Sequence, residues 1–424
     1  MRTAQTLASD EYFAAVTAAS YQDDPYSCLS ALREAGAVHR SSSGIWLVTR
    51  YEDAARLLKD PRLSNDTVTA AEQTAAVVRG SARSSGYRLP QPVTTLDPPE
   101  HKRVRTLLGQ AMGADLTARL RPRIDAVIGE LVDRIRAGDS EGDLVADFAL
   151  PLPLTITGEL LGVPPEDLSK VRAWGEALAR NGDPEFLVSA ADRAHGAAAE
   201  EEFATYFASL TLQRRRSGGT DMIAALSTAK PHPVAGRMSF AERVVNGMFL
   251  FINGYHNTVS LISLTVLALL RFPDQLAALR ADPGLAAAAV SEAMRYDSPI
   301  QSIARVTVAD YAVGGRTVPA GQQVMSLIGA AHRDPRAFAS PDRLDIKRKG
   351  ALPALSFGSG AHYCMGAALA RLQAQAAVSA IVLSFPELEL AGEPEWHPTI
   401  ALRGLRRLPV QYRQSSASTA GATT

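Results

Sequence analysis

The chain has 424 residues, of which 46% are hydrophobic, and its 44 basic side chains balance its 44 acidic ones. This composition is typical of a globular protein with a large buried core. The balanced charge argues against a nucleic-acid-binding protein, which usually carries a strongly basic domain or stripe.

The cysteine content and the apolar patterning indicate the cellular compartment of the protein. Cys28 and Cys364 are the only cysteines, which is too few for a disulfide framework and suits a reducing cytoplasm. The first residues lack the charged start and apolar run of a secretory signal. No stretch has the roughly 18–20 uninterrupted apolar residues that cross a bilayer. We therefore expect a cytoplasmic protein without membrane or nucleic-acid partners.

We expect one domain over residues 21–412. Residues 1–20 are predicted to be weakly ordered, and the small, polar residues 413–424 to form a disordered tail.

The first half of the chain predicts mostly helices. A helix over 24–40 is followed by a strand over 45–50 and a helix over 51–59 that ends at Asp60-Pro61. Residues 64–96 are rich in Ser, Thr, Gly and Pro and predict a loop with a short helix. The next helix starts after Pro98-Pro99, with Glu100 in its first turn. Further helical patterns cover 117–137, 150–162, 165–180, 190–216 and 220–227.

The second half continues with a long helix. Ser239 and Glu242 fit a capping box that opens it, and it runs to about residue 271. Polar residues interrupt its apolar stretch, 244–270, which therefore indicates a buried helix. The remaining pattern predicts helices at 273–280, 284–297 and 366–384 and strands within 303–325 and 387–412. The predicted fold class is mainly α with a small β region.

One loop carries chemistry. The segment Phe357-Gly-Ser-Gly-Ala-His-Tyr-Cys364-Met-Gly366 leads straight into a helix. Its glycines permit tight or left-handed backbone. A cysteine just before a helix N-terminus is favoured as thiolate by the backbone N–H groups and the helix dipole. Such a thiolate can be the axial ligand of haem iron and favour O–O cleavage. A lone buried cysteine is more often a small apolar residue, so support is needed from elsewhere.

That support is a resemblance to a family. The loop is similar to the cysteine loop of soluble bacterial cytochromes P450, Phe-Gly-x-Gly-x-His-x-Cys-x-Gly followed by Leu-Ala-Arg at 369–371, and it matches without a mismatch. Family-like stretches extend the resemblance over about 24–412. It implies a single, roughly triangular cytochrome P450 domain. It also implies haem b (iron protoporphyrin IX), with Cys364 on the iron, Phe357 shielding the sulfur and Gly366 in the cofactor loop.

The resemblance assigns further residues to the cofactor and its support. Two buried haem propionates require cationic partners, and the resemblance gives this role to His101, Arg105, Arg305 and His362. Glu292 and Arg295, at i,i+3 on one helix, would form a buried pair. Arg343, in Pro341-Asp-Arg343-Leu344, would complete it. This network would hold the cysteine loop and has a structural role.

The long helix departs from the family pattern. The family has Ala-Gly-x-acid-Thr, whereas this chain has Asn253-Gly254-Tyr255-His256-Asn257-Thr258. In the family the acid and the alcohol help deliver protons to iron-bound oxygen. The predicted catalytic residues are therefore Asn253, Gly254, His256, Asn257 and Thr258, with Gly254 letting the helix open where oxygen fits.

Three interpretations of this departure stay open. In the first, delivery is rebuilt: His256, with an ordinary pKa near 6.5, passes protons through water, and the Asn257 amide donates to bound dioxygen. In the second, delivery is impaired, and the substrate supplies part of the network, as in oxidative ring coupling. Thr258 would then take the alcohol role, although one residue along a helix is a rotation of about 100°. In the third, His256 points away from the haem.

Asn253 replaces a small residue over the iron and suggests one property of the substrate. A buried amide without a partner costs roughly 1–3 kcal/mol. We therefore expect the substrate to offer an amide, an indole N–H or a hydroxyl, as an aromatic natural product such as a cyclic dipeptide does. Arg83, Tyr87 and Arg88 are interpreted as solvated. Beside part of the loop 82–95, the predicted substrate contacts are Phe249, Ile252, Asn253, Gln301, Ser302, Ile303, Thr399 and Ile400.

The function that follows is oxidation of a small hydrophobic or aromatic secondary metabolite with dioxygen. A ferredoxin and its reductase would supply electrons at the cysteine-side face, because the chain lacks the four cysteines of an iron–sulfur cluster. We expect a monomer. One alternative is oxidative C–C or C–N coupling of an aromatic natural product such as a cyclic dipeptide. The other is a non-catalytic haem protein that binds a ligand or a partner.

Overall fold

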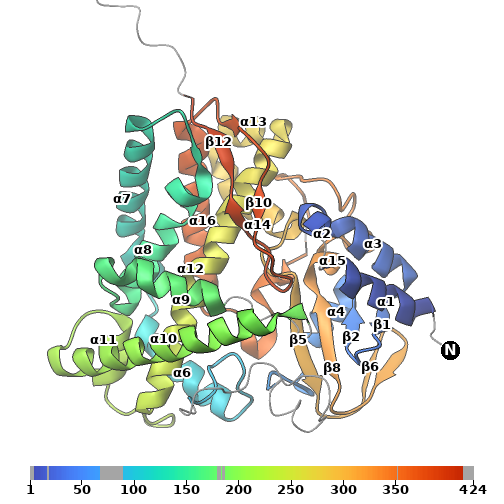
Figure 1. The fold of residues 1–424 in the computed structure, drawn as a ribbon, viewed down its shortest axis with the longest axis horizontal. Helices are drawn as coiled ribbons and strands as arrows, with labels where there is room; N and C mark the ends of the chain where they lie inside the picture. The colour runs from blue at the N-terminus through green and yellow to red at the C-terminus, as the bar shows by residue number, and fades with distance from the viewer. Residues whose placement is uncertain are drawn as a thin grey trace, which may run out of the picture.

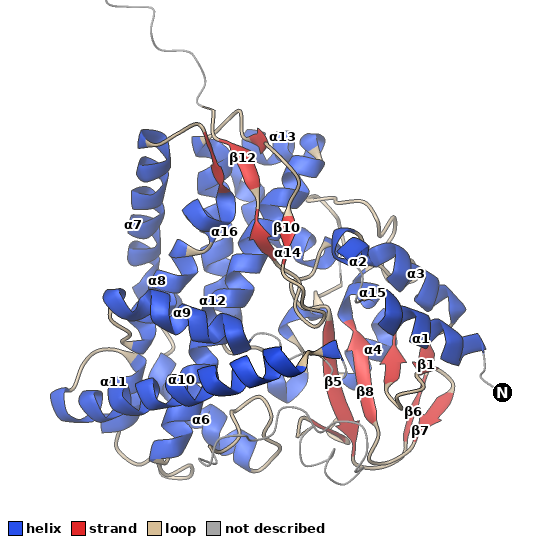
Figure 2. Cartoon of the chain, in the orientation of Figure 1, coloured by secondary structure: helices blue, strands red, loops and turns tan. Residues whose placement is uncertain are grey.

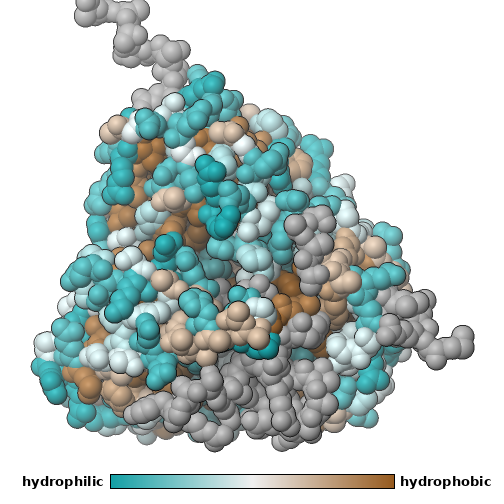
Figure 3. Space-filling model, viewed as in Figure 1, coloured by the Kyte–Doolittle hydropathy of each residue, from teal (hydrophilic) through white to brown (hydrophobic). Residues whose placement is uncertain are grey.

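A computed structural model shows a mainly helical molecule with a roughly triangular outline (Figure 1). It describes residues 4–16, 19–66, 89–178, 183, 187–350 and 352–413. The long helices gather on one side, and the largest sheet lies on the other with the N-terminal helices (Figure 2). Hydrophilic residues cover much of the face shown in Figure 3, with hydrophobic patches between them.

The helices carry most of the described chain. The α-helices are α1 (Ala4–Ala15), α2 (Ala19–Asp23), α3 (Pro25–Ala35), α4 (Tyr51–Leu57), α6 (Glu100–Met112), α7 (Leu116–Ala137), α8 (Pro151–Leu161), α9 (Leu168–Leu178), α10 (Ala190–Ser217), α11 (Met222–Thr228), α12 (Phe240–Arg271), α13 (Pro273–Ala281), α14 (Ala286–Tyr296), α15 (Ile328–His332) and α16 (Ala367–Ser384). Shorter helical turns are η1 (Val145–Ala149, a π-helix), η2 (Pro165–Asp167), η5 (Pro283–Leu285), η6 (Leu355–Phe357) and η7 (Gly360–His362).

The strands form one larger sheet and three small ones. They are β1 (Val38–Arg40), β2 (Trp46–Val48), β3 (Leu63–Ser64), β4 (Glu141–Asp143), β5 (Ser302–Thr307), β6 (Tyr311–Val313), β7 (Arg316–Val318), β8 (Gln323–Leu327), β9 (Glu389–Leu390), β10 (Glu395–Trp396), β11 (Leu405–Arg407) and β12 (Pro409–Gln411). The larger sheet has the order β1-β2-β8-β5-β3, with β2 parallel to β8 and the other pairs antiparallel. The small sheets are β4-β12-β9, β10-β11 and β6-β7.

The long central helix α12 begins as the sequence predicts. The Ser239 hydroxyl accepts from Glu242 N at 3.2 Å, and Ser239 N donates to the Glu242 carboxylate at 2.6 Å, which completes the capping box. Residues such as Val266 and Ile262 are fully buried, because α8, α10, α14 and α16 pack around the helix. The apolar stretch is therefore a core helix, as expected.

Helix α16 is long and apolar enough to span a membrane by length and composition alone. It lies among α7, α12 and α14, and Ala374, Ala377 and Val378 are fully buried there (Figure 1). Because a core helix of this length passes the same test, α16 is explained by packing against its three neighbours. The pair α12 and α13 also passes, but it bends by 108° at the break.

One predicted element near the N-terminus is corrected, and the segment before it contains a helix. The helix expected over 24–40 ends at Ala35, with Gly36 after it, and residues 38–40 form β1. The segment 1–20, expected to be weakly ordered, contains α1, whose Tyr12 and Phe13 are buried in a cluster with Leu29. The apolar face of α1 has a partner in α3, which the weak local pattern did not indicate. Of the expected tail, residues 414–424 lie outside the described residues.

Candidate functional site

A cavity of about 360 Å³ is lined mainly by helical residues. Its lining comes from α12, from the cysteine loop with α16, and from α6, α8, α11, α14 and β5. The cavity brings together all the predicted cofactor residues, namely His101, Arg105, Arg305, Phe357, His362, Cys364 and Gly366. These residues span more than 260 positions of sequence, and the fold alone assembles them.

The cysteine loop is held by its own backbone. Cys364 N donates to Phe357 O at 2.9 Å. Gly358 and Gly360 have φ of +70° and +68°, where a side chain is strained. A Cβ on Gly360 would also lie 3.1 Å from Lys59 Cα, so close approach demands glycine there as well. The loop glycines therefore serve the geometry that the sequence predicted.

The electrostatics of Cys364 differ from expectation. The Cys364 side chain is exposed to the open cavity. Desolvation by the surrounding protein raises the pKa of its thiol, and the backbone N–H groups of Gly366 and Ala367, with Arg105 and Arg371, lower it by less. The N–H groups at the helix N-terminus therefore lower the pKa in the expected direction without outweighing desolvation. A metal cation on the sulfur would supply the missing stabilisation, because a coordinating thiol is deprotonated outright.

Four cationic or potentially cationic side chains crowd one end of the cavity. The His101 and His362 rings stack with centroids 3.8 Å apart. Arg105 donates to Tyr363 O at 2.6 Å, and Arg305 donates to Ala304 O at 2.7 Å. His101 Nε2 is buried without a hydrogen-bond partner in the described part of the chain.

The pKa values of all four side chains in this group are lowered. Burial, and then His101 and the two arginines, lower the pKa of His362 to about 3. Burial and Arg105 lower the pKa of His101, and burial lowers the pKa of Arg305 to about 10. No carboxylate is among the described residues that line the cavity. A negatively charged ligand at this end would therefore be strongly favoured.

The predicted catalytic residues of α12 do not all line the cavity. Asn253, Gly254, Asn257 and Thr258 line the cavity, but His256 does not. The His256 ring faces His397, after β10, at 5.8 Å between centroids. Burial and His397 lower its pKa to about 4. Of the three interpretations, the geometry matches the one in which His256 points away, so its predicted catalytic place in the cavity is wrong.

The hydrogen bonds of Asn253 and Asn257 also differ from those expected. Asn253 Nδ2 donates to Phe249 O at 3.0 Å, so its amide does not depend on a substrate for a partner. Asn257 Nδ2 donates to Asn253 Oδ1 at 3.3 Å, so this amide donor is already used within the helix. Thr258 donates to Gly254 O at 3.0 Å. In this structure the Asn257 amide nitrogen is thus directed at Asn253, and its donation to dioxygen stays a prediction.

Gly254 has a packing reason that the sequence did not reveal. A Cβ at this position would lie 2.8 Å from Thr157 Cγ2 and 3.0 Å from Thr157 Oγ1. Helix α8 therefore approaches α12 closely beside the cavity, and only glycine fits between them.

The predicted substrate contacts are partly correct. Phe249, Asn253 and Ile303 line the cavity, as do Val93 and Thr94 from the predicted loop. Arg83, Tyr87 and Arg88 lie outside the described residues. The side chains that the structure places elsewhere are Ile252, Gln301, Ser302, Thr399 and Ile400.

Each misplaced residue has a local reason. Gln301 donates to Ser298 O at 2.7 Å, and Thr399 donates to Leu402 O at 2.7 Å. Ile400 is buried in the cluster that holds α1. Ser302 precedes Ile303 on β5, and successive strand residues face opposite sides. Ile252 lies toward α9, where a Cβ on Gly175 would be 3.5 Å from its Cγ1.

Sequence reasoning missed much of the apolar wall. The additional apolar side chains lining the cavity include Leu160, Leu161, Met222, Leu250, Leu261, Met294 and Ile300. They come from α8, α11, α12, α14 and the turn before β5. Nothing distinguishes these residues in sequence from ordinary core positions, so no local signal could have found them.

The supporting pair of acid and arginine forms as expected, with a different third member. Arg295 binds both Glu292 oxygens, at 2.8 and 2.9 Å, in a buried bidentate pair. Arg348 Nε donates to Glu292 Oε1 at 3.0 Å. Arg343 is instead exposed, and its guanidinium lies 3.4 Å from Asp274. The prediction of Arg343 is therefore wrong, although its backbone O accepts from Arg295 at 3.0 Å.

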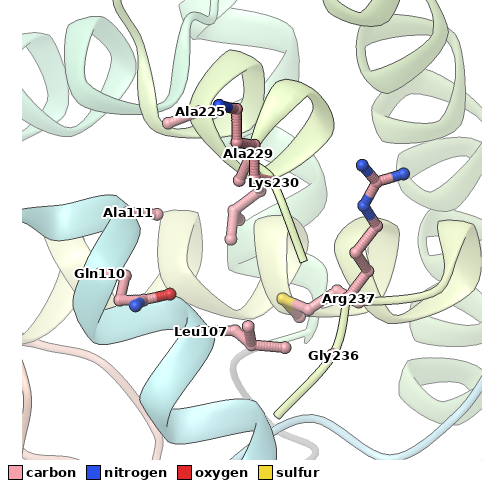
Figure 4. Close-up of a pocket in the computed structure, with 10 residues that line it drawn as sticks. Leu107, Gln110, Ala111, Ala225, Ala229, Lys230, Gly236 and Arg237 are labelled. Carbon is pink, nitrogen blue, oxygen red and sulfur yellow. The ribbon is translucent and has the colours of Figure 1, made fainter. Parts of the chain in front are cut away.

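A second, smaller cavity of about 120 Å³ lies between α6 and α11 (Figure 4). Leu107, Gln110 and Ala111 come from α6, while Lys230 and Arg237 follow α11. No cysteine, histidine or carboxylate lines it among the described residues. Among its described lining residues, Lys230 is the one side chain of a type that serves as a nucleophile or a base, and the cavity places no second acid or base beside it.

Comparisons with known proteins agree with this geometry. A family model described as Cytochrome P450 matches residues 284–410. Cytochrome P450 107B1 of Saccharopolyspora erythraea is 37% identical over 372 residues, covering 86% of this chain and 89% of that protein. Cytochrome P450 monooxygenase PikC of Streptomyces venezuelae is 36% identical over 404 residues, 92% of each chain. The ligand-free crystal structure of Mycobacterium smegmatis CYP164A2 matches with a TM-score of 0.86 at 32% identity, covering 95% of this chain and 99% of that one.

Proposed function

Because the chain belongs to the cytochrome P450 family and is thus a haem-iron oxidoreductase, we propose that it uses dioxygen to oxidise a small hydrophobic or aromatic secondary metabolite. The cofactor of this proposal is haem b. One observation carries it: a single cavity is lined by Cys364 and by the cationic group of His101, Arg105, Arg305 and His362, with no carboxylate among its described lining residues.

The residues fit the cofactor. Cys364 would hold the iron, Phe357 would shield the sulfur, and Gly366 lies beside it, since a Cβ there would be 3.9 Å from Cys364 Sγ. His101, Arg105, Arg305 and His362 would hold the propionates, whose charges would relieve the lowered pKa values and pair the orphaned His101 Nε2. When bound, the haem supplies oxygen activation at its iron.

The chain's own residues shape the reaction. The apolar wall of Phe249, Leu161, Met294 and Ile303 selects a hydrophobic substrate and keeps water out. Asn253, Asn257 and Thr258 are the polar groups of α12 that face the same space. We assign them to orienting the substrate and an ordered water. His256 is assigned to the α12–β10 contact.

The remaining parts of the proposal concern partners. A ferredoxin with its reductase would deliver electrons at the face that carries the cysteine loop, as the family resemblance implies. The protein would act as a cytoplasmic monomer. Sedimentation of the haem-loaded protein, with and without a reduced bacterial ferredoxin, measures both its oligomeric state and its binding of ferredoxin.

The cofactor assignment is tested by spectroscopy. The reduced, haem-loaded protein should show the red-shifted carbon monoxide spectrum of thiolate ligation, and Cys364→Ser should lose it. Cys28→Ser is the matched control and should keep the spectrum, since Cys28 lies in α3, away from the cavity. A thiolate spectrum that survives Cys364→Ser would contradict the proposal, as would failure of the unaltered chain to take up haem.

A second function has a specific observation in its favour. With His256 turned away and no carboxylate among the described lining residues, the α12 wall lacks the acid that the family pattern contains. We therefore keep oxidative C–C or C–N coupling of an aromatic natural product, such as a cyclic dipeptide, as the alternative. Product mass separates the two: hydroxylation adds one oxygen atom, whereas coupling removes hydrogens. Intact haem with no turnover from any electron source would instead indicate a non-catalytic haem protein.

A further inference from the structure

Helix α12 carries a buried amide just before its cavity-lining face begins. The residues of α12 that line the cavity recur at the spacing of one helix face, and they are Phe249, Leu250, Asn253, Gly254, Asn257, Thr258 and Leu261. Asn246 lies three positions before Phe249 and seven before Asn253, so it occupies the next place on the same face. Asn246 is fully buried and does not itself line the cavity. Along α12, the lining therefore stops just short of Asn246.

A turn over residues 92–95 is hydrogen-bonded to Asn246. Thr95 N donates to Pro92 O at 3.0 Å, which closes a β-turn with Val93 and Thr94 at its centre. The N–H of the second residue has no partner within such a turn. Here that residue is Val93, and its N–H donates to Asn246 Oδ1 at 2.9 Å. Because both Val93 and Thr94 line the cavity, Asn246 attaches a part of the cavity wall to α12.

The Asn246 amide can lie in only one way. Its Nδ2 donates to Glu242 O at 2.8 Å, and a carbonyl can only accept, whereas Val93 N–H can only donate. Both hydrogen bonds are thus lost if the amide turns over. The anchor is itself held, because the Glu242 carboxylate accepts from Arg103 of α6 and from Ser239 N in the capping box. Asn246 therefore presents a fixed acceptor to the turn.

The two ends of the same segment are held elsewhere. Gln91 Nε2 donates to Asp66 Oδ1 at 2.9 Å. At the other end, the Asp97 carboxylate accepts from Asn65 N at 2.9 Å and from the Ser64 hydroxyl. These bonds join residues 91 and 97 to residues 64–66, whereas Asn246 holds the centre of the turn to α12. A change at Asn246 should therefore release the turn locally and leave its ends in place.

We propose that Asn246 determines specificity by limiting the length of the substrate, because it positions the turn 92–95 as the wall at this end of the cavity. Asn246 is a positioning residue, since it acts through Val93. The inference rests on the proposed function and deepens it by narrowing the substrate class. Compact hydrophobic or aromatic molecules fit beneath the turn. A molecule with a long aliphatic chain has to displace the turn and break the hydrogen bond between Val93 and Asn246.

Two imidazoles that differ in chain length test this limit. The imidazole nitrogen of each binds haem iron, so 1-butylimidazole and 1-dodecylimidazole share an anchor and differ in the chain that enters the cavity. Titration of the haem-loaded protein, followed by haem absorbance, gives the ratio of the two affinities. Asn246→Leu should shift this ratio about tenfold toward the dodecyl compound, which corresponds to about 1.4 kcal/mol, because no hydrogen bond has to be broken. An unchanged ratio would overturn the proposal.

A conservative variant separates positioning from a general structural role. A protonated aspartic acid has one O–H donor and an acceptor oxygen, and burial favours the protonated form. Asn246→Asp can therefore make both hydrogen bonds, and at pH 6 it should restore the affinity ratio of the unaltered protein. A merely structural role of Asn246 would weaken both imidazoles alike in Asn246→Leu, with no change in their ratio, and would contradict the positioning role.

Thr265→Val is the matched control on the same helix. Thr265 is fully buried, its hydroxyl donates to Leu261 O at 2.6 Å, and it does not line the cavity. The variant thus removes a buried hydrogen bond of α12 without touching the turn, and it should keep the affinity ratio. A shift in Thr265→Val as large as that in Asn246→Leu would refute the assignment to Asn246.

Hydrogen exchange at Val93 N–H tests the turn directly, and it also works without a variant. In the unaltered haem-loaded protein, 1-dodecylimidazole should speed this exchange relative to 1-butylimidazole, because the long chain displaces the turn. Equal exchange in the two complexes would overturn the proposal. The carbon monoxide spectrum separates this inference from the cofactor assignment. If the thiolate spectrum is present but Asn246→Leu leaves the affinity ratio unchanged, only the specificity inference fails.

Discussion

Arg348 Nε lies 3.0 Å from Glu292 Oε1 and completes the buried pair that Glu292 forms with Arg295. The Arg348 side chain is only 11% exposed, and its NH2 group donates to Arg343 O at 3.0 Å. The same carboxylate also accepts from Asp345 N at 3.1 Å. One buried acid thus fixes the segment 343–348, which precedes the cysteine loop.

This relationship predicts a clear difference between two arginines. Arg348→Met should lower the free energy of unfolding by about 2–3 kcal/mol, because it removes charge-assisted hydrogen bonds from a buried carboxylate. Arg343→Met should leave the urea midpoint close to wild type, since that side chain is exposed. Urea unfolding followed by circular dichroism measures both. If Arg343→Met lowered the free energy of unfolding more than Arg348→Met does, Arg343 and not Arg348 would be the third member of the Glu292–Arg295 pair.

Close packing at Gly254 predicts an interaction between two helices. Gly254→Ala should cost about 1–3 kcal/mol in unfolding free energy, because the added methyl overlaps Thr157. In a Thr157→Ala background the overlap is relieved. The same Gly254→Ala change should then stabilise by up to about 1 kcal/mol, as alanine does over glycine in a helix. A double-mutant cycle checks this, and additive effects would rule the contact out.

The cationic end of the cavity predicts which residues retain the cofactor. Arg305→Leu should speed haem transfer to apomyoglobin by roughly tenfold or more, because a charge-assisted hydrogen bond is worth about 1.5–3 kcal/mol. Lys102→Leu is the control: it lies on α6 next to His101 but is exposed and does not line the cavity. Its transfer rate should match wild type. Equal acceleration by both variants would indicate a general charge effect.

Burial of His256 predicts a dependence of stability on pH. Its folded pKa of about 4 lies below the ordinary value of 6.5, so between these values the unfolded chain binds a proton that the folded chain does not. The contribution of neutral His256 to the free energy of unfolding is therefore fully present above pH 6.5, and it is lost as the pH falls toward 4. The slope approaches about 1.4 kcal/mol per pH unit.

His256→Gln should flatten this slope in urea unfolding at pH 7, 6 and 5. The lowered pKa values of His332 and His362 act in the same direction, so part of the slope remains. Val259→Ala, also buried on α12, is the control, because it should lower stability equally at each pH. An unchanged slope in His256→Gln would show that His256 is protonated alike in the folded and unfolded chain.

The sequence by itself determined the features that are local. The capping box at Ser239, the glycine-bent loop before Cys364 and the Glu292–Arg295 spacing are each set within ten consecutive residues. Their physical causes, namely backbone capping, permitted φ angles and neighbouring positions on one helix face, operate over that range. The resemblance to cytochromes P450 rested on these motifs, and it gave the family and the cofactor residues.

Only the tertiary structure decided what depends on contacts between distant segments. Whether Arg343 or Arg348 reaches Glu292, whether His256 faces the cavity or His397, and which turn Asn246 holds against α12 all depend on where other elements lie. The tertiary structure also decided which residues of α8 and α11 form the apolar wall of the cavity, because a leucine in the core and a leucine in a pocket look alike in sequence. Burial and direction are properties of the packed chain, and no local pattern encodes them.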